Sequence, residues 1–185
     1  MRKHLFILLS MICFLHTSAQ FTLTQDGFVA TNNTSKNYII YHCDGKTQAE
    51  LYRKVLLAMN ASYKSPYDII SEVPEEIITL RGIQNHKIQL ARSEFFDLHY
   101  NLTLRFKDNK IRIDRPSFEC FFTKNGDRVT LTLTRKSTEP ILLRIFNPNN
   151  GNVELDKVKS QLESFFNDLC NQIKLSIENN EEPDW

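Results

Sequence analysis

The spacing of hydrophobic residues predicts a strand followed by a helix early in the chain. Residues 37–43 carry the aromatic and β-branched side chains typical of a strand. Apolar residues then recur at helical spacing, and Thr47 with Glu50 three positions later has the form of a capping box. We therefore expect a helix that begins at Thr47 and is ended by Pro66.

The hydrophobic period becomes two between residues 67 and 135, where turn residues separate the apolar runs. This pattern predicts a series of strands. From Val153 to Ile177 the helical period returns with one continuous apolar stripe, which predicts a long second helix. We expect residues 20–178 to form a single domain and residues 179–185 to follow as an acidic, frayed tail.

An Asn-Gly turn fixes the register of one predicted hairpin. Asn125-Gly126 is the dipeptide typical of a two-residue hairpin turn. The resulting register places the apolar side chains on one face of the hairpin and the polar ones on the other, so the pattern is consistent with itself. The cross-strand pairs are Thr123 with Arg128, Phe122 with Val129, Cys120 with Leu131 and Phe118 with Leu133.

A second turn, at Asp108-Asn109, sets the register of the preceding hairpin. Its cross-strand pairs are Phe106 with Ile111, Leu104 with Ile113, and Arg105 with Arg112. The inward-facing residues have odd numbers on the strand after this turn, at Ile111 and Ile113. They have even numbers on the next strand, at Phe118 and Cys120. One extra residue must lie between them, and we expect a bulge at Arg115-Pro116.

These elements together predict the fold class. Consecutive hairpins form an antiparallel sheet that is apolar on one face, and the two amphipathic helices have no other surface to pack on. We expect an α+β fold of the TBP-like or helix-grip type, with an early helix and a long C-terminal helix on one face of the sheet. The other face is left open to solvent or to a ligand.

The first 19 residues have the pattern of a cleaved signal peptide. A basic start precedes the eleven-residue apolar run from Leu5 to Leu15, and Thr17-Ser18-Ala19 offers the small residues that a signal peptidase reads. That run is too short to cross a bilayer, which takes about 20 residues. We expect cleavage after Ala19, a mature protein without a membrane span, and a periplasmic or extracellular location.

Charge and cysteine content limit the classes of partner and scaffold. The 185 residues include 23 Lys and Arg against 22 Asp and Glu, and this net charge of +1 gives no general attraction to nucleic acid or to an anionic membrane. Three cysteines remain after cleavage, Cys43, Cys120 and Cys170, and an odd number cannot all pair within one chain. A disulfide-rich scaffold is therefore excluded, which leaves at most one bridge or three buried thiols.

Two segments resemble a known family. Residues 45–52, Gly-Lys-Thr-Gln-Ala-Glu-Leu-Tyr, look like the start of its first helix. Residues 100–112 resemble its next block, an apolar alternation that leads to Lys-Asp-Gly-Lys, an aromatic residue and Arg, although this chain has Asn109 and Ile111 in place of the glycine and the aromatic residue. The family is the secreted domain-of-unknown-function family 4468, common in Bacteroidota. The resemblance spans residues 35–178 and implies a TBP-like fold, but no activity, ligand or catalytic residue.

Motifs for nucleotide and metal binding are incomplete. Gly45-Lys46-Thr47 lies where the end of a phosphate-binding loop would, but Ile40 stands where that loop requires its first glycine. The capping box accounts for Thr47 without a nucleotide. His42, His86 and His99 are not at the spacing of metal ligands. We therefore expect no cofactor and no metal site.

Candidates for catalysis are equally weak. Cys120 and Cys170 fall on apolar faces, where a thiol is expected to be buried and unreactive. The carboxylate pairs Glu75-Glu76 and Glu94/Asp97 lie in or near predicted turns and are interpreted as solvated charge rather than as a glycosidase pair. We expect a protein that is not an enzyme.

The expected function is binding in the cell envelope, through the open sheet face or the groove between the sheet and the last helix. On the open face the candidate ligand residues are Arg105, Arg112 and Arg128, which could hold an anionic group from an envelope glycan or from the carboxylate of a partner. Alternatively, Asp114 neutralises the Arg105 and Arg112 pair. A second hypothesis is an interaction or structural subunit whose exposed face is covered by another envelope protein.

Overall fold

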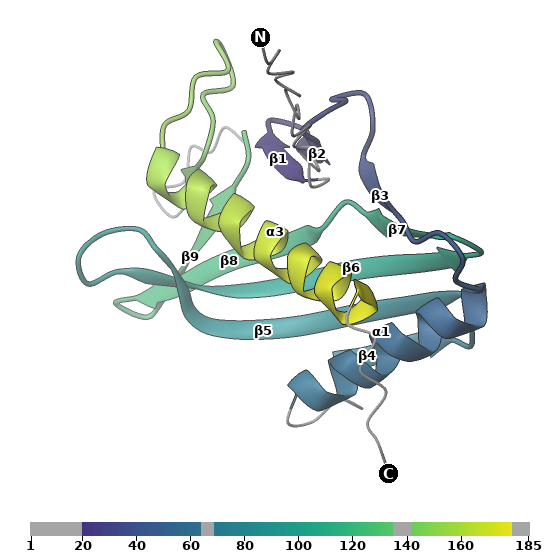
Figure 1. The fold of residues 1–185 in the computed structure, drawn as a ribbon. Helices are drawn as coiled ribbons and strands as arrows, with labels where there is room; N and C mark the ends of the chain where they lie inside the picture. The colour runs from purple at the N-terminus through teal and green to yellow at the C-terminus, as the bar shows by residue number, and fades with distance from the viewer. Residues whose placement is uncertain (1–19, 64–68, 135–141, 179–185) are drawn as a thin grey trace, which may run out of the picture.

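The computed structural model describes residues 20–63, 69–134 and 142–178. The expected signal peptide, Pro66 and the acidic tail lie outside these ranges. Within them the chain forms two helices that lie across one face of a large sheet, with a small hairpin beside the longer helix (Figure 1).

More of the described chain lies in strands than in helices. The helices are α1 (Gln48–Ser62) and α3 (Asp156–Glu178). The strands are β1 (Phe21–Thr24), β2 (Gly27–Ala30), β3 (Tyr38–His42), β4 (Ile70–Val73), β5 (Ile77–Gln89), β6 (Phe95–Lys107), β7 (Lys110–Asp114), β8 (Ser117–Lys124), β9 (Asp127–Thr132) and β10 (Leu142–Arg144).

The large sheet is built around the long strand β6. Its main path runs β10-β9-β8-β6-β5-β4, and β7 pairs with both β6 and β3. Strands β7 and β8 lie one after the other along the same edge of β6. The pairing shifts by one residue between Leu104↔Ile113 and Asn101↔Ser117, so the expected bulge at Arg115-Pro116 is confirmed.

The turn residues set the registers that the sequence predicts. Phe106 pairs with Ile111 and Arg105 pairs with Arg112. The second hairpin also has the predicted register, but its ladder ends at Cys120↔Leu131 because β9 stops at Thr132, so the expected Phe118–Leu133 pair is wrong. Asn109, which stands where the family block has glycine, adopts the left-handed φ of +63° that this turn needs.

The two helices cover one face of the sheet, which confirms the predicted α+β arrangement. Side chains of alternate residues on the central strands are buried under α1 and α3, and those between them face away. The sheet differs from the prediction at one edge, since β10 runs parallel to β9. No helix of the described residues is both long and apolar enough to cross a membrane.

Helix ends depart slightly from the sequence pattern. The capping box at Thr47 and Glu50 is present, as predicted, but α1 ends at Ser62 and Tyr63 is already extended. Helix α3 starts at Asp156 rather than at Val153, because Val153 forms an isolated bridge with Phe146 before the helix begins.

The β1–β2 hairpin is an element that the sequence analysis did not predict. It lies against α3, as Figure 1 shows, and Phe21 and Phe28 are fully buried there. Asn167 of α3 bonds both backbone groups of Phe21, accepting from its N–H at 2.8 Å and donating to its carbonyl at 3.0 Å. The Glu163 carboxylate accepts from the Leu23 N–H at 2.8 Å. Side chains of α3 thus satisfy the edge of β1 in place of another strand.

Candidate functional site

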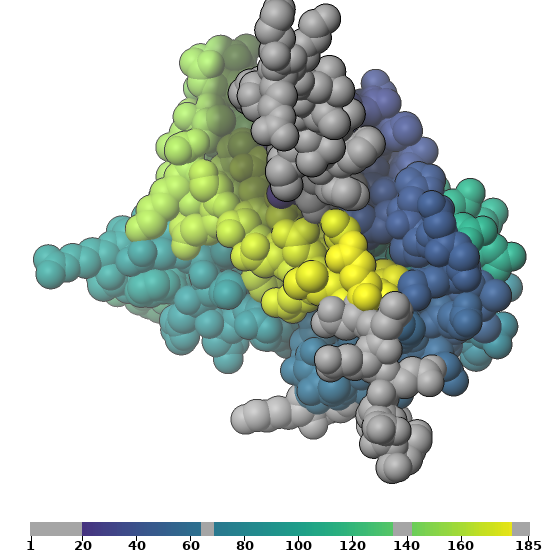
Figure 2. All heavy atoms as spheres, viewed as in Figure 1, coloured from purple at the N-terminus to yellow at the C-terminus, as the bar shows by residue number. Residues whose placement is uncertain are grey.

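A groove lies where the end of α1, the middle of α3 and strand β5 meet. Its volume is about 470 Å³, within the range of small-molecule sites, which span roughly 300–1,000 Å³. Figure 2 shows the atoms of α3 in yellow between the blue atoms of α1 and the teal atoms of β5. The groove is lined by Met59, Ser62, Tyr63, Gln84, Lys87, Ile88, Tyr100, Gln161, Ser164, Phe165, Asp168, Leu169 and Gln172.

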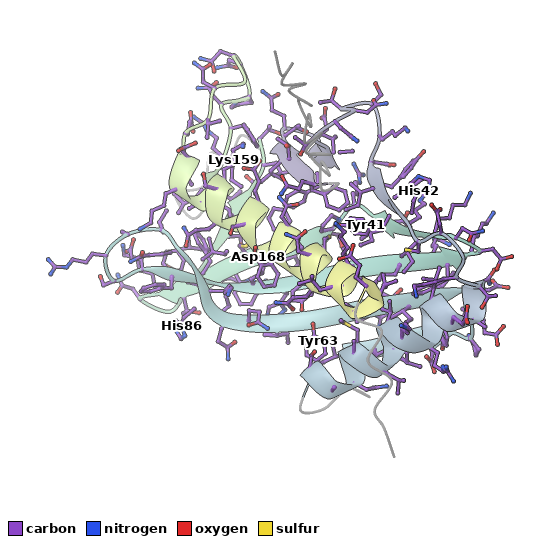
Figure 3. The ribbon with its side chains drawn as sticks, viewed as in Figure 1. Tyr41, His42, Tyr63, His86, Lys159 and Asp168 are labelled. Carbon is purple, nitrogen blue, oxygen red and sulfur yellow. The ribbon has the colours of Figure 1, made fainter. Side chains whose placement is uncertain are left out.

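Tyr100 forms the inner wall of the groove. Its ring lies directly over Gly82, where a β-carbon would approach the ring to 2.2 Å. The rings of Tyr100 and Phe165 pack in a T-shaped arrangement with centroids 5.2 Å apart, and Tyr100 is only 3% exposed. Its hydroxyl lies 3.3 Å from that of Tyr63, which Figure 3 shows at the end of α1. Burial and the bond to Tyr63 raise the Tyr100 pKa, so this hydroxyl stays protonated at neutral pH.

Two charged side chains stand at the groove. The Lys87 ammonium lies 5.3 Å from the centre of the Phe165 ring, a cation–π contact. Asp168 follows Phe165 by about one turn of α3 and accepts a bond of 3.3 Å from the Ser164 hydroxyl. The part of the chain that the structure describes contains no salt bridge to either Lys87 or Asp168.

Three glutamine side chains line the groove, and only one of them forms hydrogen bonds within the described residues. Gln161 bonds the backbone of Gln89 in both directions, at 2.9 Å each way, and so joins α3 to the end of β5. Gln84 and Gln172 also line the groove, but they have no hydrogen-bond partner among the described residues. The groove therefore offers donors and acceptors that only a ligand or water can satisfy.

The open face of the sheet carries the arginines that the sequence singled out. The structure brings Arg105 and Arg112 together across β6 and β7, as the register predicts. Both bond Asp114, with Nε to carboxylate distances of 2.8 Å from Arg105 and 2.6 Å from Arg112. The Arg112 guanidinium also lies 4.1 Å from the centre of the Tyr38 ring. Asp114 thus occupies the position between the guanidiniums that an anionic ligand would need, and an anion site here stays a prediction.

Replacing Arg105 by threonine is expected to change the free energy of unfolding by less than about 0.5 kcal/mol. Half of the Arg105 side chain is exposed, and Arg112 keeps its bond to Asp114 in the variant. Urea unfolding of Arg105→Thr beside Asp114→Asn tests this, because only the second variant leaves the two guanidiniums facing each other without a counter-charge. A loss above 1 kcal/mol in Arg105→Thr would contradict the expectation.

Arg128 does not belong to the same cluster. It stacks on Phe121, 3.7 Å from the ring centre, and lies 3.6 Å from the Glu119 carboxylate. Phe121 pairs with Asp97 on β6, eight residues from Arg105. At about 3.3 Å per residue the two arginine sites are therefore roughly 26 Å apart along the strand. A single ligand group cannot contact all three arginines.

Histidines and carboxylates stay dispersed in the fold. His42 and His86 lie at opposite ends of the sheet in Figure 3, and among the described residues no group of three His, Cys, Asp or Glu side chains could hold a metal ion. Glu94 pairs with Lys124 at 2.6 Å, and Asp97 accepts the His86 backbone N–H at 2.7 Å. Asp97 thus has its partner within the β5–β6 hairpin, and Glu94 has its partner at the end of β8.

Thiol reagents are expected to label Cys43 and to spare Cys120 and Cys170 in the folded mature protein. Burial raises the pKa of the Cys120 and Cys170 thiols to about 12, and both side chains are fully buried, whereas Cys43 is only partly buried. Counting reacted thiols before and after denaturation measures the difference, with Cys43→Ser as the control that should not react when folded. Fast native labelling of Cys120 or Cys170 would overturn the assignment.

Sequence reasoning named the groove between the sheet and the last helix but none of the residues that line it. Tyr63 continues the helical pattern in the sequence but lies where α1 has already given way to extended chain, and Lys87 lies inside the bulge of β5. Periodicity therefore did not indicate that either side chain faces the groove. One signal was present: Gly82 follows Ile78 and Leu80 at the alternate positions of a strand pattern, and a glycine within a strand often marks a close approach.

Comparison with known proteins identifies the fold. No family model matches the chain, and no curated protein matches it. Crystal structures of a TBP-like protein from Parabacteroides distasonis ATCC 8503 and of a DUF4468 family protein from Bacteroides ovatus ATCC 8483 are similar, each with a TM-score of 0.55 and 12% sequence identity. The matches cover 78% of this chain and 92% of the first protein, and 80% of this chain and 88% of the second. The fold is therefore TBP-like, as the resemblance in sequence implied.

Proposed function

We propose that this protein is a non-enzymatic binding module whose ligand occupies the groove between α1, α3 and β5. The observation that carries this proposal is the groove's lining, in which the unpartnered amides of Gln84 and Gln172 stand beside an apolar floor. Pockets that bind small molecules combine a mostly apolar surface with a few polar groups that orient the ligand. The open face supports binding less well, because Asp114 already neutralises its arginine pair.

The chemistry of the groove favours binding over catalysis. The raised pKa of Tyr100 keeps its hydroxyl protonated, which suits a hydrogen-bonding role and not that of a general base. Among the described residues the Asp168 carboxylate accepts a bond from the Ser164 hydroxyl, and no histidine lines the groove to complete a catalytic triad. Hydrogen-bonding and charged groups of this kind hold a ligand without transferring a proton.

The proposal places the protein in the cell envelope, as an exported member of the DUF4468 group. The basic start, apolar run and Thr17-Ser18-Ala19 of the first 19 residues support export. N-terminal sequencing of protein taken from the native envelope or medium should find Gln20 first. An intact Met1 would overturn this part of the proposal.

A groove-blocking substitution tests the binding function. Ser164 lies on the exposed side of α3 at the groove, so Ser164→Trp should fill the groove without disturbing the core. Ser117→Trp, at an exposed position on the open face, is the matched control. Native mass spectrometry of protein purified from its own envelope should show a bound molecule in the wild type and in Ser117→Trp, but not in Ser164→Trp. Retention of the molecule by Ser164→Trp would reject the groove.

The second candidate is a protein–protein interaction through the open face. Two apolar side chains on that face, Ile83 and Val73, are 63% and 48% exposed. Exposed apolar groups on a sheet face favour coverage by another protein. Loss of a co-purifying protein in Ser117→Trp, with the groove variant unaffected, would support this candidate instead.

A further inference from the structure

The charges at the groove indicate what class of ligand it takes, if the proposed binding function holds. Of the described residues that line the groove, only Lys87 and Asp168 are charged, and their charges are opposite. They do not form a salt bridge with each other, although they belong to the same groove. A ligand that carries both a negative and a positive group would complement the two sites at once.

Lys87 and Asp168 come from different elements that meet at Phe165. The Lys87 ammonium lies over its ring, and Asp168 follows it by about one turn of α3. Because the two side chains do not meet, the two complementary groups of a ligand need a spacer between them.

The uncharged polar groups fit a spacer that contains amides. Gln84 on β5 and Gln172 on α3 each offer an amide donor and an amide acceptor, with no partner among the described residues. The pair of hydroxyls at Tyr63 and Tyr100 needs only one proton for its mutual bond, which leaves another to donate. Peptide groups supply the matching acceptors and donors at every residue.

Two of the aromatic side chains in the groove, Tyr100 and Phe165, are already covered. Tyr100 is almost completely buried, with its ring against Gly82 and the edge of Phe165. One side of the Phe165 ring carries the Lys87 ammonium. A saccharide or a planar heterocycle that stacks on Tyr100 or on the Lys87 side of Phe165 therefore fits the groove less well than an extended chain does.

From this geometry we infer that the groove binds a short peptide segment that places an acidic side chain at Lys87 and a basic side chain at Asp168, with its backbone amides near Gln84 and Gln172. The volume of about 470 Å³ accommodates a few residues and no folded partner.

Peptides with a single charge can test the two sites separately. The probes are acetyl-Glu-Ala-Gln-amide, acetyl-Gln-Ala-Lys-amide and the neutral acetyl-Gln-Ala-Gln-amide, titrated into the mature protein by NMR. The acidic and basic probes should each bind several-fold more tightly than the neutral one. Lys87→Gln should remove the preference for the acidic probe without changing the affinity for the basic probe. Asp168→Asn should remove the preference for the basic probe without changing the affinity for the acidic probe. Lys107→Gln, at an exposed position of β6, is the control and should change neither preference.

Equal affinity for the charged and neutral probes, or preferences that survive both substitutions, would overturn the peptide assignment. So would binding of vesicles of a zwitterionic phospholipid by a protein that binds none of the peptides. In these cases the binding function itself stands if Ser164→Trp still loses the co-purifying molecule. It fails only if Ser164→Trp retains that molecule, so the two failures are distinguishable.

Discussion

Substituting alanine for Gly82 is expected to lower the free energy of unfolding by about 1–3 kcal/mol, the usual cost of forcing extra atoms into a packed core. A β-carbon at this position would lie 2.2 Å from Cζ and 2.3 Å from Cε1 of Tyr100. The ring cannot move aside easily, because the edges of Phe165 and Phe166 lie against it with centroids at 5.2 and 5.9 Å. Backbone strain plays no part, since Gly82 does not have a positive φ.

A shorter side chain at position 100 provides the control for Gly82→Ala. In a Tyr100→Leu background the ring atoms that meet the new β-carbon are absent. Adding Gly82→Ala should therefore lower the free energy of unfolding much less than it does in the wild type. A coupling of 1 kcal/mol or more between the two substitutions, measured by urea unfolding, is expected for residues in direct contact. Additive effects of the two substitutions would contradict the argument.

Gly82→Ala should also change the groove. Movement of the Tyr100 ring separates its hydroxyl from that of Tyr63, which now lies 3.3 Å away, and changes the inner wall of the groove. We expect Gly82→Ala to weaken ligand binding in protein that is still folded. Lys107→Gln, away from the groove, should leave binding unchanged.

The parts of the fold that the sequence predicts are those fixed by local chemistry. Asn125-Gly126 determines a turn, the turn determines the register of its strands, and the register determines which side chains share a face. The bulge at Arg115-Pro116 follows from the same reasoning, because a change of parity requires an extra residue. The capping box at Thr47 is similarly local, since both of its partners lie within one helical turn.

What the sequence does not predict depends on contacts between distant segments. The parallel pairing of β10 with β9 and the docking of β1 on α3 join segments whose proximity no local pattern reveals. Asn167 has no special place in the helical pattern, yet it bonds a residue 146 positions away. The groove has the same origin, since its two charged residues come from β5 and α3 and become neighbours only when α3 lies across the sheet.

The pairing of Arg105 and Arg112 shows that a correct register does not by itself establish a site. The sequence placed the two guanidiniums opposite each other, and the structure agrees. It also places Asp114 within hydrogen-bond distance of both, as the alternative interpretation of the sequence predicted. Like charges side by side are thus compensated within the sheet face, whereas the Gln84 and Gln172 side chains of the groove have no hydrogen-bond partner among the described residues.

Loss of the Phe28 ring is expected to have the largest effect on stability, about 3–5 kcal/mol for Phe28→Ala, the range measured when a buried phenylalanine is truncated. Phe28 is fully buried and its ring contacts those of Phe21, Phe118 and Phe166, with centroids 6.1, 5.9 and 5.0 Å away. These partners come from β1, β8 and α3, so one ring joins the hairpin, the sheet and the long helix.

Phe121→Ala is the matched control for Phe28→Ala, because Phe121 lies on the open face and is only partly buried between His99 and Arg128. It should lower the free energy of unfolding by less than half as much as Phe28→Ala does. Denaturant unfolding of both variants, with hydrogen exchange at the Phe21 and Leu23 amides, separates two possibilities. If β1–β2 is part of the cooperative core, Phe28→Ala lowers global stability and the protection of these amides together. If protection falls at the two amides while global stability stays within 1 kcal/mol of the wild type, the hairpin unfolds on its own. The interpretation of β1–β2 as part of the core would then be wrong.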